Sequence, residues 1–172
     1  MFTVRFVQNT DKVARMMQHL KEPRGGYEAI GEAMVERVSS TFDQSAGPWG
    51  GAWRQWSPTT VDLYDRGGLF KNMRSRPERI LLNTGTLRNS VHHEAHRDRV
   101  TIKAGGAASA YASVHQFGNP GNRLPNRAGG AHAPIPARPF MPVTSTGKAR
   151  LPAEWRKLAV EAFEDWLEAG AP

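Results

Sequence analysis

The chain carries two short motifs that decide its fold, Tyr111-Ala-Ser-Val-His-Gln-Phe-Gly118 and Ile135-Pro-Ala-Arg-Pro-Phe140. Residues 119–134 separate them and are mostly Gly, Pro, Asn, Ala and Arg. The first motif predicts a short helix, because its apolar residues have helical spacing and Gly118 and Pro120 follow at its end. The second predicts an extended strand, because a proline fixes its own φ and keeps the preceding residue out of the helical region.

On either side of these motifs, some segments have the hydrophobic spacing of a strand and others have that of a helix. Apolar residues at every second position predict a strand over 2–6 and a hairpin over 91–104 that turns at Arg97-Asp98. Helical spacing predicts three further elements. These are a short helix that ends at Pro23 and Gly25-Gly26, a long helix over 27–44, and a C-terminal helix over about 152–168.

These elements indicate an α+β fold, with a small antiparallel sheet packed by helices on one face. No period is visible from 45 to 79, so we expect two long loops, at about 45–79 and 119–134. A chain of 172 residues suits one hydrophobic core. We therefore expect a single domain over 1–172.

Further residues accompany the two motifs in a fixed order. They are Phe42, Pro48-Trp49-Gly50, Trp53, Ser57-Pro-Thr-Thr60, Leu81, Thr84-Gly85-Thr-Leu87, Ser90, Val91 and Val100-Thr-Ile102. The ordered set, from Phe42 to Phe140, resembles the phage virion morphogenesis family, the tail-completion proteins of the Mu-like G protein type. Two features depart from the family pattern: the Pro- and Arg-rich loop 119–134, and Met141-Pro142 where a glycine often follows Arg-Pro-Phe.

The resemblance implies a structural protein of a tailed bacteriophage, a late protein that acts in tail completion or head–tail joining. It implies a homo-oligomeric ring, most simply a hexamer, at the neck or upper tail end of the virion, after assembly in the host cytoplasm. Other neck, connector or tail-tube proteins are the expected partners. The motif residues expected to have structural roles are Thr84, Gly85, Leu87, Tyr111, His115, Gln116, Phe117, Gly118, Pro136, Arg138 and Phe140.

Three tryptophans, Trp49, Trp53 and Trp56, lie among glycines and prolines. Indole rings stack on bases in single-strand binders, but such proteins interleave aromatic residues with Arg or Lys, and only Arg54 intervenes here. We therefore expect the tryptophans to anchor the long excursion on the core or against a neighbouring subunit. The candidates for a partner interface are Trp49, Trp53, Trp56, Arg123, Arg127 and Phe140.

The net charge of +7 is unevenly distributed along the chain. Residues 46–140 hold thirteen basic and five acidic side chains, and no Asp or Glu occurs between 99 and 153. An excess of basic residues of this kind often marks only a solvent-exposed face with no binding role. Arg123 and Arg127 on the second loop also suit an acidic partner or nonspecific contact with DNA, and of these two we favour a protein interface.

The sequence shows no catalytic or metal-binding constellation. A metal ion could in principle bind the histidine cluster His92, His93 and His96. On a strand, however, the first two point to opposite faces, and no second motif supplies further ligands. No Ser, Cys or paired carboxylate motif accompanies His115. A role for His115 and Gln116 as donors and acceptors, which tie the helix end to the Arg138 strand, is more economical.

Composition narrows the class of protein further. The chain has no cysteine, which excludes disulfides, thiolate catalysis and Cys-type zinc sites. Four glycine pairs, at 25–26, 67–68, 105–106 and 129–130, lack the Lys-Ser/Thr of a phosphate-binding loop and are interpreted as turns. The first ten residues have no signal-peptide pattern, and no apolar run approaches membrane-spanning length, so we expect a soluble, unexported protein.

Two other classes of protein compete with the tail-completion hypothesis. A nucleic-acid-binding head-morphogenesis factor is the alternative, and the basic middle of the chain supports it. A metal-dependent nuclease or hydrolase has less support, because no catalytic set accompanies the histidines. We therefore expect no enzyme activity, no metal and no cofactor.

Overall fold

The computed structural model describes residues 10–66, 79–119 and 134–169. The helices in these ranges are α1 (Thr10–Lys21), α2 (Arg24–Gln44), α3 (Pro58–Asp65), α4 (Thr86–Asn89), the 3-10 helix η1 (Gly106–Ala108), α5 (Ser109–Phe117) and α6 (Ala153–Ala169). The strands are β1 (Val91–Ala95) and β2 (Val100–Ala104). The predicted α+β class is confirmed.

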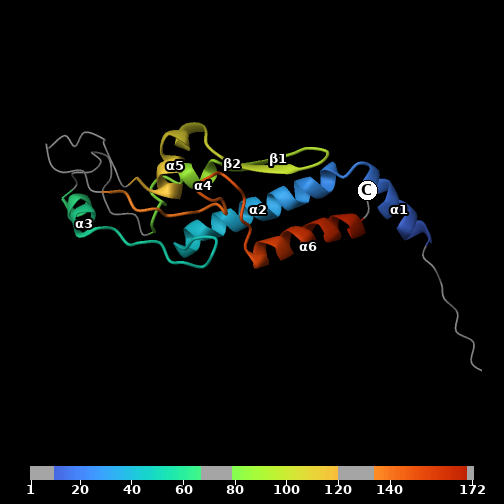
Figure 1. Ribbon diagram of the computed structural model, residues 1–172, viewed down its shortest axis with the longest axis horizontal. Coiled ribbons are helices and arrows are strands. Elements are labelled where there is room, and N and C mark those ends of the chain that lie inside the picture. The colour runs from blue at the N-terminus through green and yellow to red at the C-terminus, as the bar shows by residue number, and fades with distance from the viewer. Residues whose placement is uncertain (1–9, 67–78, 120–133, 170–172) are drawn as a thin grey trace, which may run out of the picture.

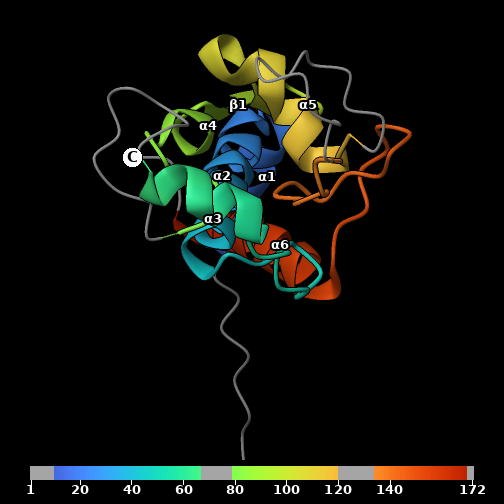
Figure 2. The ribbon, with the colours of Figure 1, turned by 90° about the vertical axis from the view of Figure 1, so that its left-hand side faces the viewer.

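Helix α2 is the axis of an elongated molecule (Figure 1). The β1–β2 hairpin packs along one side of α2, and α6 packs along another. Helix α1 lies at one end, beside the C-terminal half of α6, while α4 and α5 lie near the C-terminal end of α2 and α3 lies beyond it at the opposite end. Figure 2 views the molecule from that second end, with α3 in front of α2.

The predicted hairpin and the position of its turn are confirmed. Val91 pairs with Ala104 and Ala95 pairs with Val100 in an antiparallel ladder. The turn is closed by the His96 amide, which donates to the Arg99 carbonyl at 2.8 Å. Helix α2 covers one face of this hairpin, which agrees with the expectation of helices packed on one side.

The core lies where the second half of α2 meets the segments that carry the aromatic motif residues. The Phe42 ring packs edge-on against Trp53, with centroids 5.6 Å apart, and against Phe140 at 5.3 Å. All three side chains are buried. Around them lie the other buried apolar residues, Met34, Val38, Ile80, Leu87, Val91, Ala108, Ala112 and Trp155.

The glycine pair Gly25-Gly26 is not the predicted turn. Both residues lie inside the first turn of α2, which begins at Arg24 and not at 27. A Cβ added to Gly26 would lie 2.3 Å from the Phe163 ring, and one added to Gly25 would lie 2.5 Å from the Trp166 indole nitrogen. The glycines therefore serve the close approach of α6 aromatic rings to α2, and not a change of chain direction.

Two further predictions are wrong in detail. The 45–79 excursion contains helix α3, which a Ser57 cap and Pro58 at the first helical position begin. Residues 135–140 do not form a strand: Ile135 makes an isolated bridge to Asn119, and the prolines that follow lack the N–H that a ladder needs. The predicted strand over 2–6, the glycine pairs at 67–68 and 129–130, and Arg123 and Arg127 lie outside the described residues.

Candidate functional site

A pocket of about 670 Å³ opens at the α3 end of the molecule. Four segments far apart in sequence line it: the stretch from Arg54 into α3, the residues around the start of α4, helix α5, and residues 134–138. Each of these segments contains one of the sequence motifs. The motifs, which are far apart along the chain, therefore meet at one concave surface. Its volume is in the range of pockets that bind small ligands or single side chains.

The first wall of the pocket comes from α3 and the residues before it. The Ser57 hydroxyl oxygen accepts a bond from the Thr60 amide at 3.2 Å, which caps the helix, and Pro58 supplies the pre-set φ of a first helical residue. This cap orients α3 so that Tyr64 packs against Trp56, with ring centroids 5.9 Å apart. Burial raises the pKa of Tyr64, so its hydroxyl is neutral at pH 7.

The second wall is the Thr84-Gly85-Thr-Leu87 element. Gly85 has φ +74°, which glycine adopts without strain, and it begins the short helix α4. The hydroxyls of Thr84 and Thr86 lie 2.7 Å apart across this turn. Leu87 contacts the pocket and is buried in the core, so this motif joins the site to the hydrophobic interior.

Gln116 ties helix α5 to the segment after the pocket, as the sequence predicted. Its side-chain oxygen accepts bonds from the amides of Phe140 and Met141, both at 3.0 Å. Its side-chain nitrogen donates to the Met141 carbonyl at 2.8 Å. One buried amide thus replaces three main-chain bonds that a sheet would have supplied.

Gly118 lets the same two segments come close together. Its φ is +75°, and a Cβ at this position would lie 2.8 Å from the Ala137 amide nitrogen. Any other residue would push the 134–138 segment away from α5. The motif glycine is therefore explained by both its backbone conformation and its close neighbour.

His115 contributes to the tie through its main chain and to the pocket through its ring. Its carbonyl accepts a bond from the Arg138 amide at 2.7 Å, and its ring lies edge-on to Tyr111, 5.8 Å between centroids. The ring Nδ1 is buried with no hydrogen-bond partner among the described residues. Burial, and then the charge of Arg138, lower the pKa of His115, so the ring is neutral at pH 7.

Arg138 is the buried cation of the site, with 7% of its surface exposed. Its Nε donates to the Arg54 carbonyl at 3.0 Å, and its Nη2 donates to the Gln55 carbonyl at 3.5 Å. Burial, and then the nearby charge of Arg54, lower the pKa of Arg138. An arginine remains charged at neutral pH in any such setting, so the pocket holds a fixed positive charge.

The structure corrects part of the predicted interface set. Trp53 and Phe140 have 3% and 1% of their surface exposed, and the Trp53 indole donates to the Pro139 carbonyl at 2.9 Å. These two residues belong to the core of the subunit and are not available as surface anchors. The sequence could not show this, because an aromatic residue among Gly and Pro has the same local pattern whether it packs inward or outward.

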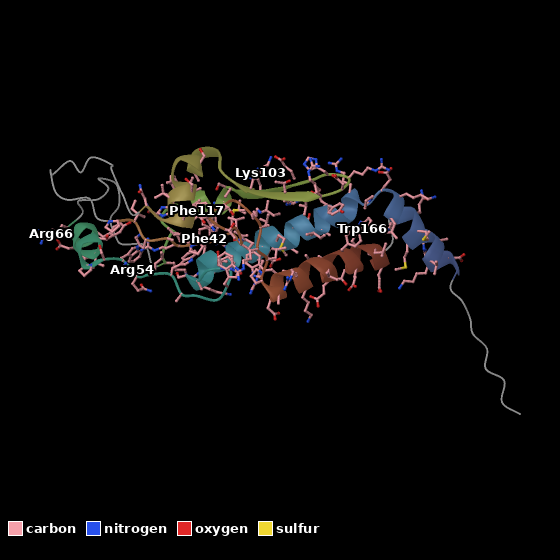
Figure 3. All side chains as sticks on the ribbon, in the orientation of Figure 1. Phe42, Arg54, Arg66, Lys103, Phe117 and Trp166 are labelled. Carbon is pink, nitrogen blue, oxygen red and sulfur yellow. The ribbon has the colours of Figure 1, made fainter. Side chains whose placement is uncertain are left out.

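The other interface candidates lie at or near the surface. Trp49 is 45% exposed, and its indole donates to the Arg150 carbonyl at 3.2 Å. Trp56 is half-buried in the pocket wall, and Phe117 is exposed at the end of α5. Pro136 lines the pocket beside Ile135. Figure 3 labels Arg54 and Phe117 at this end of the molecule.

Arg54 and Tyr64 are among the lining residues that the motifs do not include. Arg54 is the basic residue between two tryptophans, and its position beside a motif tryptophan is a usable signal. Tyr64 lies within a stretch predicted to have no regular structure, and the Ser57-Pro58 cap could have revealed the helix that carries it. Leu81 belongs to the ordered motif set, but no sequence pattern indicates its φ of +62°, an unusual conformation for a bulky residue.

The predicted strand geometry of the histidine cluster is confirmed. The His92 Nδ1 lies 2.9 Å from the Ser90 carbonyl oxygen, while the His93 Nε2 lies 2.9 Å from a Glu28 carboxylate oxygen on α2. Within the described ranges, no three His, Asp or Glu residues are grouped so as to hold a metal ion. No helix in those ranges is long and apolar enough to cross a membrane.

Comparison with known proteins identifies the class of protein that this fold and pocket represent. Residues 5–153 match the model of the phage virion morphogenesis family, and the chain belongs to that family. Its role is therefore in the assembly of phage virions. Among curated proteins it is similar to protein G of Escherichia phage Mu, with 28% identity over 120 residues, which is 69% of this chain and 68% of that protein. The name of the Mu protein assigns it provisionally to capsid assembly. No solved structure matches the chain significantly.

Proposed function

We propose that this protein completes the phage tail and joins it to the head, as a subunit of a ring at the neck or upper tail end. The observation that carries the proposal is the family match over residues 5–153, which includes every segment that lines the pocket. The proposed role is structural and not catalytic. It needs contacts with identical subunits and with a second virion protein.

Two surfaces at opposite ends of the molecule suit these two kinds of contact, the α1 face for a neighbouring subunit and the pocket for a second virion protein. The pocket lies at the α3 end, and α1 lies at the other end (Figure 1). Helix α1 exposes Val13, Met17 and Leu20, which follow one another at i, i+4 and i+7 and so share one face of the helix. Subunits that contact one another through unlike surfaces form closed rings when the rotation between them closes. Six subunits is the expected number at a tail end.

A nucleic-acid-binding role in head assembly is the alternative. The provisional name of the Mu relative and the excess of basic residues between 46 and 140 favour it. This alternative would place the protein at an earlier step, before the head is filled with DNA. The two functions therefore differ in which intermediate accumulates when the protein is missing.

A stop codon early in the gene, in a phage or prophage that carries it, tests the proposal. We expect lysates that contain DNA-filled heads and separate tails, with few joined particles, as counted by electron microscopy. A plasmid copy of the wild-type gene should restore joined particles and infectivity. Empty or missing heads would contradict the neck role and support head assembly, and normal joined particles would contradict both.

A further inference from the structure

The pocket carries an unbalanced positive charge. Arg54 and Arg138 both line it, and no Asp or Glu occurs among its described lining residues. Other arginines at this end of the molecule are paired with carboxylates: Arg66 with Asp62 at 2.8 Å, and Arg79 and Arg88 with the two oxygens of Asp43. The described part of the chain supplies no carboxylate partner for either pocket arginine, which sets them apart from their neighbours.

The environment of Arg138 makes an added anion favourable. Its guanidinium is held in place by two main-chain carbonyls, which supply partial negative charge but no full counter-charge. A buried cation without a counter-charge is costly, and the charge of Arg54 nearby adds repulsion. A carboxylate in the pocket would relieve both, and hydrogen bonds between guanidinium and carboxylate are among the stronger ones in proteins.

The walls of the pocket select a peptide rather than a nucleic acid. Trp56, Tyr111 and Leu87 provide aromatic and aliphatic surface beside the two cations. Such a surface suits an apolar side chain that neighbours an acidic one. The phosphates of duplex DNA are read by exposed cations on a broad face, whereas Arg138 has only 7% of its surface exposed and lines a concave pocket.

We propose that this pocket binds an acidic peptide segment of an adjoining virion protein, with a carboxylate on Arg54 and Arg138 and a flanking apolar side chain against Trp56 and Tyr111. The identity of the partner as another virion protein rests on the proposed function. His115 also lines the pocket, and its buried Nδ1 has no partner among the described residues.

The test uses the full-length, ¹⁵N-labelled protein and two synthetic peptides that differ only in charge. The probes are acetyl-Phe-Glu-Leu-amide and acetyl-Phe-Gln-Leu-amide, titrated at pH 7 and low salt. The Glu peptide is expected to shift the side-chain Nε–H signals of Arg54 and Arg138 saturably, with an affinity about tenfold higher than that of the Gln peptide.

Two charge reversals form a matched pair. Arg54 is exposed, and no hydrogen bond from its side chain holds the described fold, so Arg54→Glu should fold normally and bind the Glu peptide about tenfold more weakly. Arg156→Glu makes the same charge change on the exposed face of α6, outside the pocket lining, and should bind the peptide as the wild type does.

Several results would overturn the inference. The first is equal binding of the Glu and Gln peptides. The second is equal weakening of peptide binding by the two charge reversals. The third is a response of the pocket signals to a duplex DNA of about two helical turns but not to the Glu peptide. The stop-codon phage separates this inference from the neck role. If the protein binds the Glu peptide but the stop-codon phage fails to make heads, the pocket inference stands and the neck role is wrong. If the protein does not bind the peptide but the stop-codon phage makes unjoined heads and tails, the neck role stands and the pocket inference is wrong.

Discussion

His115 has a neutral imidazole near a buried cation, which links the stability of the fold to pH. Burial and the charge of Arg138 lower the pKa of His115 below its ordinary value of 6.5. Below pH 6.5 the unfolded chain therefore binds a proton that the folded chain does not. The free energy of unfolding should be highest above that pH and should fall as the pH is lowered through 6.5, by at most about 1.4 kcal/mol per pH unit for one proton.

The measurement is urea unfolding of the wild type and of His115→Gln at several pH values between 7.5 and 5.5. His115→Gln removes the titrating group, so its free energy of unfolding should depend less steeply on pH in this interval. His96→Gln is the control for the exchange itself, because it makes the same substitution at an exposed position beyond the end of β1. An equal slope in wild type and His115→Gln would contradict the assigned role of this ring.

Motif residues could be recognised from the sequence, but only some of their separate roles could. Gln116, Phe140 and Arg138 all belong to the same two short motifs. Local spacing predicts the helix end that carries Gln116, and the tie that its amide makes is confirmed. Nothing local distinguishes Phe140, which is buried in the core, from a surface anchor, because its burial depends on Phe42 nearly a hundred residues earlier.

At the scale of elements, the contact between α2 and α6 depends on small residues under large rings. Gly26 leaves space for the Phe163 ring, and Gly25 leaves space for Trp166. Figure 3 shows Trp166 between the two helices, near α1. The sequence interpretation of this glycine pair as a turn failed because glycine has two uses, conformational freedom and lack of volume, and the pattern alone does not separate them.

Gly26→Ala should therefore destabilise the protein, although alanine is the better helix former. The helix propensity of alanine contributes at most about 1 kcal/mol, whereas forcing a methyl group into the Phe163 ring costs about 1–3 kcal/mol. We expect a lower midpoint of urea unfolding at an unchanged slope. Gly51→Ala is the control, because a Cβ there has no atom within 4 Å. Equal midpoints for the two variants would show that α6 tolerates the added methyl group.

Helix α3 could have been predicted from its start signal, but the hydrogen-bond partners of residues 135–140 could not have been predicted. Ser57-Pro58 is a recognised helix start, but eight residues of α3 are too few for a clear period among the surrounding glycines. Residues 136–140 form no ladder, because their hydrogen-bond partners are the side chain of Gln116 and the main chain of α5. A pairing of this kind leaves no period-two pattern in the sequence.

At the scale of the whole molecule, the pocket forms only when segments about eighty residues apart meet. The sequence contains every motif that lines it, and their fixed order indicates the family. It contains no sign that Arg54 reaches the same space as Arg138, since that depends on the path of the segment between α2 and α3, which runs beyond the end of α2. The elongated shape, with the pocket at one end and α1 at the other, is likewise a property of packing between α2, α6 and the hairpin.

The apolar face of α1 is the surface that ring formation would use at the end opposite the pocket. Val13, Met17 and Leu20 are 52%, 58% and 49% exposed, while His19 on a neighbouring face is buried against Trp166. Met17→Glu places a charge in the middle of this face and leaves the α1–α6 contact intact. If the face packs against the next subunit, the variant should fold with an unchanged unfolding midpoint and should fail to join heads to tails, because the charge would be buried without a partner.

The measurement is complementation of the stop-codon phage by plasmid-borne variants, scored as joined particles and infectious titre. This assay does not depend on whether the isolated protein forms rings in solution. Ala14→Glu is the control, since it adds the same residue at an exposed position outside the apolar face and should complement as well as the wild type. Failure of both variants would point to a general intolerance of charge on α1. Full complementation by Met17→Glu would show that the apolar face of α1 is not buried in the assembled virion, and the subunit contact would then have to lie elsewhere.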